Sequence, residues 1–174
     1  MIRVLISGCN GHMGQIVAQL CSENPDVEIA AGINRTPIQK NDFPVYSDPM
    51  EFPGEADVLI DFSNPANLTA LLRYCTEKKM PAVLCTTGYS AEQIREIEAA
   101  AQVVPMFRSG NMSLGINLLL ALVKKAAAVL GKDYDIEIVE RHHHRKVDAP
   151  SGTALMLADA AASQLPEGTE YVYD

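Results

Sequence analysis

The residues with the clearest chemical potential form a basic block, HHHRK at positions 142–146, in an otherwise acidic chain. Histidine can donate or accept a proton near neutral pH, and lysine supplies a fixed positive charge or a second proton donor. Just beyond the block, Gly152 and Thr153 open an apolar helical pattern, so their backbone N–H groups can bind a carboxylate at the helix N-terminus. The block and the helix start therefore predict a site that binds a small anion and protonates it.

Three other interpretations of the block compete with that one. Consecutive histidines can ligate a metal, but neighbours on an extended chain point to opposite faces, so only His142 and His144 share a side, and we assign no metal. A nucleic-acid partner is not expected, because 14 Lys and Arg against 22 Asp and Glu give a net charge of -8. A solvated run of charge is the third alternative.

A second candidate site is GCNGHMG at positions 8–14, directly after an N-terminal apolar run. Glycines let a backbone turn tightly and approach a pyrophosphate, whose charge a following helix N-terminus stabilises. The spacing is G-x-x-G-x-x-G, with Asn10 where a second glycine often stands, and asparagine tolerates left-handed dihedrals better than most residues. The stretch predicts a dinucleotide site, and a plain strand-to-helix turn is the alternative.

Further cofactor contacts are expected at the ends of later strands. An acidic residue normally binds the adenosine ribose about twenty residues after the last glycine, and Asn34 and Arg35 stand there instead. Asn34 can still hydrogen-bond a ribose hydroxyl, and Arg35 can contact a 2′-phosphate or stack on adenine, so NADH and NADPH both stay open. Two segments with small and hydroxyl-bearing residues, CTTG at 85–88 and RSGNM at 108–112, suit a nicotinamide ribose site.

These residues need a scaffold, and alternating short strands and helices predict one. The expected strands are 2–7, 27–33, 57–62, 82–87 and 103–107, and the expected helices are 14–22, 66–79 and 90–101. Such βαβ units predict a Rossmann-like, doubly wound parallel sheet of the α/β class. Ser90 and Gln93 have capping-box spacing, which defines the start of the third helix. Residues 34–54, with four prolines, are interpreted as a surface excursion between strands.

The pattern changes after Asn111, and we place a domain change near Met112. An apolar helix is predicted at 114–130 and interpreted as core, followed by an alternating strand at 135–140 and a helix at 152–164. We therefore expect a dinucleotide-binding domain at 1–112 and the start of an α+β domain at 113–174.

Composition limits the class of protein further. A chain of 174 residues with 48% hydrophobic and 21% charged residues is long enough for one α/β domain, or for one domain and part of a second. The best candidate for a membrane span, Leu114–Leu130, is interrupted by two lysines, so no membrane partner is expected. The four cysteines lack C-x-x-C spacing and no signal peptide is evident, so we expect reduced thiols in the cytoplasm.

Taken together, the turn at 8–14, TTG at 86–88, NMSLGIN at 111–117 and ERHHHRKVDAPSGTA at 140–154 resemble the 4-hydroxy-tetrahydrodipicolinate reductase family, the dihydrodipicolinate reductases. The resemblance runs along essentially the whole chain, and its H-H-x-x-K-x-D-x-P-S-G-T-A pattern is highly specific. It implies an oxidoreductase of diaminopimelate and lysine biosynthesis that reduces 4-hydroxy-tetrahydrodipicolinate, a small cyclic dicarboxylate, to tetrahydrodipicolinate. NADH or NADPH is implied as the hydride donor, with loss of water overall.

The resemblance also implies roles for individual residues. It implies His142 as the catalytic proton donor and acceptor, and Lys146 as a second catalytic donor. Substrate carboxylates are implied to contact His143, Gly152 and Thr153. Cofactor contacts are implied at Gly8, Cys9, Asn10, Gly11, His12, Met13, Arg35, Cys85, Thr86, Thr87, Ser109, Gly110, Asn111 and Met112, and Asn34 stands where many members have an acidic ribose ligand. His144 and Arg145 fill variable positions and are given only an electrostatic role.

Chain length qualifies these expectations. Members of the family continue beyond residue 174, complete a mixed sheet that builds a homotetramer, and return a helix to the nucleotide domain. The resemblance therefore implies that 113–174 is the first part of an incomplete substrate-binding and oligomerisation domain. Two alternatives stay open: a truncated dinucleotide-binding module without turnover, and a related NAD(P)-dependent dehydrogenase that acts on another small acid.

Overall fold

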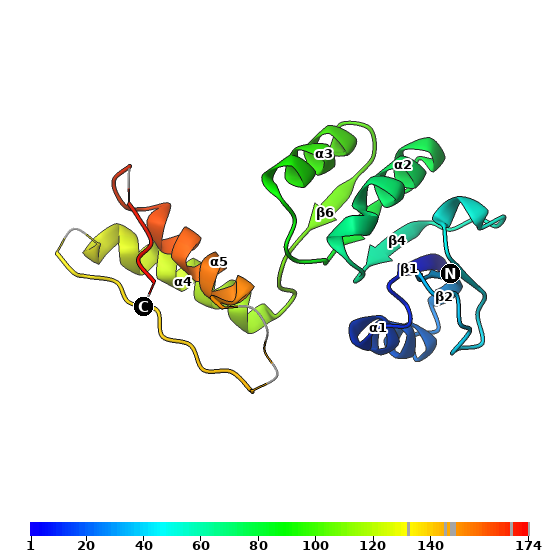
Figure 1. The fold of residues 1–174 in the computed structure, drawn as a ribbon, viewed down its shortest axis with the longest axis horizontal. Coiled ribbons are helices and arrows are strands. Elements are labelled where there is room, and N and C mark those ends of the chain that lie inside the picture. The colour runs from blue at the N-terminus through cyan, green and yellow to red at the C-terminus, as the bar shows by residue number, and fades with distance from the viewer. Residues whose placement is uncertain (132, 145, 147–148, 168, 174) are drawn as a thin grey trace. The chain divides into compact units, whose positions relative to one another are not determined.

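The computed structural model describes residues 1–131, 133–144, 146, 149–167 and 169–173 of the chain (Figure 1). These residues form two compact units, Met1–Ser109 and Gly110–Asp174. Each unit is described by itself below. None of the helices in the described ranges is long and apolar enough to cross a membrane.

A parallel six-stranded sheet forms the first unit, in the order β3-β2-β1-β4-β5-β6. The strands are β1 (Ile2–Ser7), β2 (Val27–Ile33), β3 (Val45–Tyr46), β4 (Val58–Asp61), β5 (Ala82–Leu84) and β6 (Met106–Arg108). This order confirms the predicted doubly wound α/β fold, since the chain runs outward in both directions from β1 and β4. In such a sheet a ligand binds where the strand order reverses, outside the carboxyl ends of these two strands.

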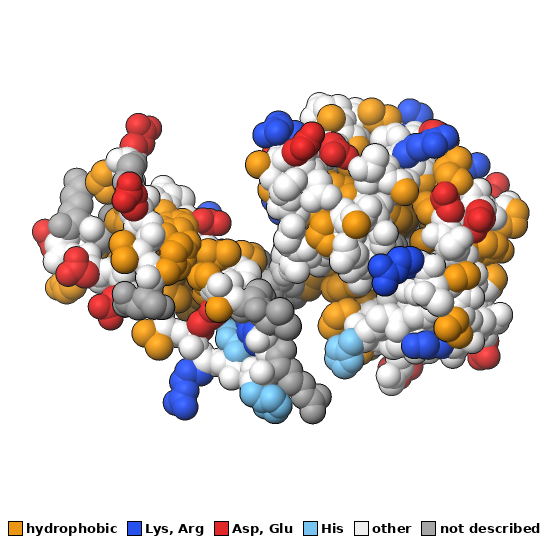
Figure 2. All heavy atoms as spheres, in the orientation of Figure 1, with side chains coloured by type: hydrophobic (Ala, Val, Ile, Leu, Met, Phe, Trp, Pro, Cys, Tyr) orange, Lys and Arg blue, Asp and Glu red, His pale blue; other side chains and the backbone are white. Residues whose placement is uncertain are grey.

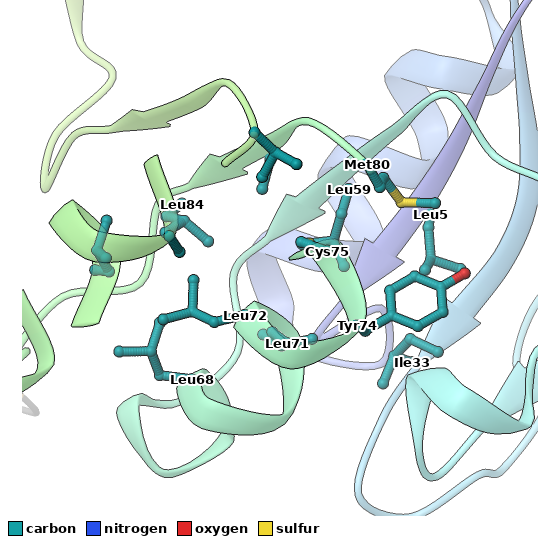
Figure 3. Packing of buried hydrophobic residues seen from close by; sticks show 14 of the residues in the cluster. Leu5, Ile33, Leu59, Leu68, Leu71, Leu72, Tyr74, Cys75, Met80 and Leu84 are labelled. Carbon is teal, nitrogen blue, oxygen red and sulfur yellow. The ribbon is translucent and has the colours of Figure 1, made fainter. Parts of the chain in front are cut away.

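Helices cover both faces of this sheet, with α2 (Leu68–Lys78) and α3 (Ala91–Ala101) on one face and α1 (His12–Ser22) on the other (Figure 1). The apolar residues of α2 recur with helical spacing and pack against Leu5, Leu59 and Leu84 of the strands (Figure 3). Those strand residues are completely buried. Burial on both faces explains why these strands are apolar runs rather than alternating ones.

The start of α3 confirms the predicted capping box. The Ser90 hydroxyl accepts the Gln93 backbone N–H at 3.2 Å, and the Gln93 side chain accepts the Ser90 N–H at 3.0 Å. Two N–H groups that a helix leaves without internal partners are satisfied in this way.

The segment predicted as a surface excursion, residues 34–54, is more ordered than expected. It contains β3, which extends the sheet beyond β2, and a 3-10 turn at Pro49–Glu51. Phe43 and Phe52 from this segment are buried in the cores on the two faces of the sheet. The prolines concealed this short strand, and the two aromatic side chains anchor the segment to the unit.

The turn after β1 is built on close backbone contacts. Gly8 has a φ of +78°, and a Cβ on it would lie 2.4 Å from the Phe62 carbonyl oxygen. A Cβ on Gly14, in the first turn of α1, would lie 2.1 Å from the Gly8 carbonyl oxygen. Only glycine fits at either position. Asn10 does not adopt the left-handed conformation considered for it, because the positive φ falls on Gly8 instead.

The second unit contains α4 (Leu114–Leu130) and α5 (Gly152–Ala162), which pack against each other. The interpretation of α4 as a core helix is wrong for this structure, since Leu114 is 85% exposed and Ala127 is its only buried residue. Orange side chains gather over these helices in Figure 2. Its packed neighbour among the described residues, α5, covers one face, so the apolar side chains on the other faces of α4 stay exposed.

The strand predicted at residues 135–140 is also wrong, because this segment is irregular in the structure. Residues 171–173, at the end of the chain, are not a strand either. A strand forms only where another strand takes its backbone hydrogen bonds, and the sheet contains no strand from the described residues of the second unit. The alternating sequence pattern is present, but the described residues contain no second strand that pairs with this segment.

Replacing Gly14 with alanine tests the close approach of α1 to the turn. We expect Gly14→Ala to lower the free energy of unfolding by about 1–3 kcal/mol, because the new methyl group must displace backbone rather than a side chain. Gly115→Ala is the matched control, since its Cβ meets only the Ser113 hydroxyl at 3.7 Å. Thermal or urea unfolding measures both variants, and equal stability of the two would contradict the predicted contact.

Candidate functional site

In the first unit, the predicted residues 8–13 lie at the carboxyl end of β1 and lead into α1. The Gly11 N–H donates to the Gly8 carbonyl at 2.9 Å, and Gly11 then caps α1 without a side-chain hydrogen bond. The first-turn N–H groups of α1 therefore face a turn from which side chains are excluded at Gly8 and Gly14. Such a turn fits the pyrophosphate of a dinucleotide.

Asn10 has a different function in the turn from the one its backbone tolerance suggested. Its side-chain amide donates to the carbonyls of Thr36 and Ile38 at 3.2 and 2.8 Å. Asn34 also donates its side-chain amide to the Thr36 carbonyl, at 2.9 Å. Asn10 thus joins the loop after β2 to the glycine turn, whereas the Asn34 hydrogen bond stays within that loop and uses the side-chain nitrogen rather than the oxygen.

Arg35 lines a surface pocket of about 240 Å³ at the end of β2. The other lining residues are Ile33, Ser47, Asp48, Pro49, Asn67, Ala70 and Leu71. A guanidinium and a carboxylate therefore share one pocket. A flat apolar ring can stack there on Arg35, whereas a phosphate would meet one cation and one anion.

At the end of β5, the Thr86 hydroxyl lies in a network that sequence reasoning missed. It donates to the carboxylate of Asp61 at 2.7 Å and accepts the backbone N–H of Ser63 at 2.9 Å. Asp61 is 0% exposed, although it ends an apolar strand. An acidic residue closing a buried strand at the point where strand order reverses was the available signal.

The two cysteines among the predicted cofactor residues are not reactive groups. Burial raises the pKa of the Cys9 thiol to about 11, and it raises the pKa of the Cys85 thiol to about 11 as well. Both are therefore protonated thiols at neutral pH. Any contact they make to a cofactor is expected through the backbone.

The segment at 108–112 is divided between the two units. Ser109 ends the first unit, where its N–H donates to the Leu84 carbonyl at 3.1 Å. Asn111 belongs to the second unit, where its side-chain amide donates to the Thr153 hydroxyl at 3.1 Å. The structure thus brings a predicted cofactor residue, Asn111, together with a predicted substrate residue, Thr153.

In the second unit, the basic block lies close to the start of α5. Glu140 makes this connection, since one carboxylate oxygen accepts the Ser151 N–H at 2.8 Å and the other lies 3.5 Å from His142 Nδ1. The His143 carbonyl accepts the Lys146 N–H at 3.1 Å. Arg145 and residues 147–148 of the motif lie outside the described residues.

Glu140 is a second residue to which sequence reasoning gave no role. Hydrogen bonding to Ser151, through the hydroxyl first and the backbone second, lowers the pKa of Glu140, and nearby His142 lowers it further. Its carboxylate therefore stays ionised to acidic pH and fixes the histidine-bearing segment to the helix start. The first glutamate of the ERHHHRK sequence was the available signal.

The N-terminus of α5 lies at the residues for which an anion site was predicted. The Ser151 hydroxyl accepts the Ala154 N–H at 3.0 Å, which leaves the earlier N–H groups of Gly152 and Thr153 outside that cap. Gly152 is exposed and Thr153 is partly buried. A carboxylate bound here would be close to the segment that contains His142.

Within the described ranges, no group of three or more His, Cys, Asp or Glu side chains is placed to hold a metal ion.

The Glu140 contact predicts a pH-dependent change at the start of α5. The folded pKa of this carboxyl lies below its ordinary value of 4.5, so the interaction is fully present above pH 4.5 and is lost as the pH falls through the lower folded pKa. In an NMR titration we expect the Ser151 amide shift to change with a midpoint below 4.5. The Ile116 amide, whose acceptor is the Ser113 hydroxyl, is the control and should not titrate there. A Ser151 midpoint at or above 4.5 would contradict the contact.

Comparison with known proteins agrees with the two units. The family profile described as dihydrodipicolinate reductase, N-terminus, matches residues 2–112, and the profile for the C-terminus of the same family matches residues 115–171. A 4-hydroxy-tetrahydrodipicolinate reductase of Caldanaerobacter subterraneus is 54% identical over 173 residues. That of Clostridium tetani is 48% identical over 173 residues. The alignments cover 99% of this chain and 68% of each relative.

Solved structures show the same similarity in three dimensions. The dipicolinate-bound dihydrodipicolinate reductase of a Paenisporosarcina species has a TM-score of 0.77 and 27% identity, and the alignment covers 99% of this chain and 69% of that one. The WlbA dehydrogenase of Bordetella pertussis, at 18% identity and a TM-score of 0.58, shares the fold over 74% of this chain and 42% of its own. The two family profiles, together with relatives that are 48% and 54% identical, place this chain in the dihydrodipicolinate reductase family.

Proposed function

We propose that the chain contributes to the NAD(P)H-dependent reduction of 4-hydroxy-tetrahydrodipicolinate to tetrahydrodipicolinate, a step of diaminopimelate and lysine biosynthesis. In this reaction the substrate takes up a hydride and a proton and loses one water. The observation that carries the proposal is the Glu140 bridge, which joins the His142 segment to the N-terminus of α5. Glu140 would thereby hold the proton donor, His142, close to the carboxylate site at the start of α5. The relatives named for this reaction support the assignment.

The first unit would hold the dinucleotide. The turn at 8–14 has no room for side chains at Gly8 and Gly14, and the start of α1 supplies backbone donors for a pyrophosphate. Arg35 would bind the adenosine end of the cofactor. Its pocket contains a cation, Arg35, and an anion, Asp48, so it favours neither the 2′-phosphate of NADPH nor its absence in NADH, and both stay candidates. The bound nicotinamide would supply the hydride.

The second unit would hold the dicarboxylate. Gly152 and Thr153 would donate backbone N–H groups to a carboxylate, and His143 would contact the substrate beside them. His142 would donate the proton, because its Nδ1 faces Glu140 and the carboxylate orients the imidazole. Lys146 would supply the second donor and a positive charge.

We also infer the wider setting from the family resemblance. Residues 1–112 would be the cofactor-binding part, and residues 113–174 would belong to the substrate-binding and oligomerisation part. The whole protein would be a cytoplasmic homotetramer.

His142→Gln and Lys146→Ala test the proton donors. Glutamine keeps hydrogen-bonding capacity but cannot transfer a proton at neutral pH, so kcat is expected to fall about 10²–10⁴-fold for His142→Gln. A smaller fall is expected for Lys146→Ala. Steady-state NAD(P)H oxidation with 4-hydroxy-tetrahydrodipicolinate measures both, and the dinucleotide Kd should stay unchanged. His144→Gln, at a variable motif position, is the matched control and should keep near-normal turnover.

Near-normal turnover in both test variants would refute these catalytic roles. Two measurements on the unsubstituted chain separate the alternative functions. Dinucleotide binding without turnover would favour a binding module. Turnover of another small acid, with no competition from a planar pyridine-dicarboxylate, would favour a different dehydrogenase.

A further inference from the structure

We infer that Asp61 is a positioning residue for the dinucleotide site, holding the turns after β4 and β5 in the arrangement that receives the nicotinamide half of the cofactor. This inference rests on the proposed function of the first unit. It concerns a side chain that is itself completely buried and that the proposed reaction does not use.

Both oxygens of the Asp61 carboxylate accept hydrogen bonds. One accepts the Ser63 N–H at 3.2 Å, and the other accepts the Thr86 hydroxyl at 2.7 Å and the Tyr89 hydroxyl at 3.2 Å. The Ser63 N–H is shared with the Thr86 hydroxyl oxygen at 2.9 Å. The carboxylate, Ser63 and Thr86 therefore form a closed ring of contacts between two turns.

A carboxylate is needed because every neighbour is a donor toward it. An asparagine has one acceptor oxygen. If that oxygen accepts the Ser63 N–H, its N–H₂ faces the Thr86 and Tyr89 hydroxyls, which must then turn to accept; if it accepts the hydroxyls, its N–H₂ faces the Ser63 N–H, which can only donate. In a buried site such a donor facing a donor is costly, since water cannot replace the missing partner. The hydrogen-bond pattern thus distinguishes Asp61 from a residue of the same shape.

The side chains near the Asp61 carboxylate that could ionise include Cys75, Cys85 and Tyr89, and their raised pKa values keep them protonated at neutral pH. Burial is the larger cause, and the charge of Asp61 is the second. Together they raise the pKa of the Cys75 thiol to about 12, and they raise the pKa of the Tyr89 hydroxyl above its ordinary range. The same two causes raise the pKa of Cys85. Among the described residues no cation forms an ion pair with Asp61. Its stabilisation therefore depends on the hydroxyl and backbone donors of the two turns.

The ring is continuous with the glycine turn. The Phe62 N–H donates to the Ser7 carbonyl at 3.0 Å, and the Gly8 position lies against the backbone of Phe62 and Ser63. Moving Ser63 would therefore move the surface on which the phosphate-binding turn rests. Asp61 thus couples the three turns after β1, β4 and β5. These turns lie where the strand order of the sheet reverses, on the side that we expect to face the nicotinamide.

Asp61→Asn tests this role through the ratio of two affinities. The chain's Kd for NADH should rise on the order of tenfold, because the turns near the nicotinamide half lose a charge-assisted contact. The Kd for AMP, which lacks both the pyrophosphate and the nicotinamide, should stay within about twofold, because the adenosine site at Arg35 is separate from the ring. Calorimetric titration measures both ligands. Tyr89→Phe, which removes only an outer hydrogen bond, is the control and should bind both as the unsubstituted chain does.

A second variant keeps the inference testable if Asp61→Asn does not fold. Thr86→Val removes the hydroxyl that donates to Asp61, so it should weaken NADH binding and leave the Kd for AMP unchanged, as Asp61→Asn does. Equal weakening of NADH and AMP binding would overturn the inference and leave Asp61 a purely structural residue. Normal NADH affinity in Asp61→Asn or in Thr86→Val would overturn it as well. Failure of the unsubstituted chain to bind NADH would instead refute the proposed function.

Discussion

Close approach of backbone to backbone at the turn after β1 is the constraint on which the candidate cofactor site depends. Gly8 lies against the Phe62 carbonyl, and Gly14 lies against Gly8, with no room for a Cβ at either place. These two contacts set the entry of α1 and the distance between the turns that follow β1 and β4. They also keep side chains away from the first N–H groups of α1, which is the property that a pyrophosphate site requires.

The same edge of the sheet is held by polar side chains that form hydrogen bonds to neighbouring loops. Asp61 gathers donors from the turns after β4 and β5, and Asn10 holds the loop after β2 by two backbone carbonyls. Hydrogen bonds of this kind are directional, so they define the positions of loops that hydrophobic packing alone would leave adjustable. The apolar core beneath, from Leu5 to Leu84, supplies the rigid platform.

In the second unit the candidate substrate-binding residues lie at the start of a helix rather than at the edge of a sheet. Ser151 begins α5, and Glu140 fixes that start to the segment with His142. Positive charge, a titratable imidazole and backbone donors are thus concentrated in an otherwise acidic chain. Such a local concentration favours a small anionic ligand over a polyanion.

Local pattern and spacing were sufficient to predict several features from the sequence alone. The βαβ alternation predicted the doubly wound sheet, and the Ser90 capping box predicted the start of α3. The glycine turn, TTG, NMSLGIN and ERHHHRKVDAPSGTA stretches together indicated the family, because each is a pattern of neighbouring residues. Only the tertiary structure decided the contacts of Asp61, the contacts of Asn10, the short strand β3 and the exposure of α4. Each of these depends on a partner distant in sequence. The alternating pattern at residues 135–140 illustrates the limit, since periodicity specifies which face a residue could bury, whereas a strand forms only when a second segment accepts its backbone hydrogen bonds.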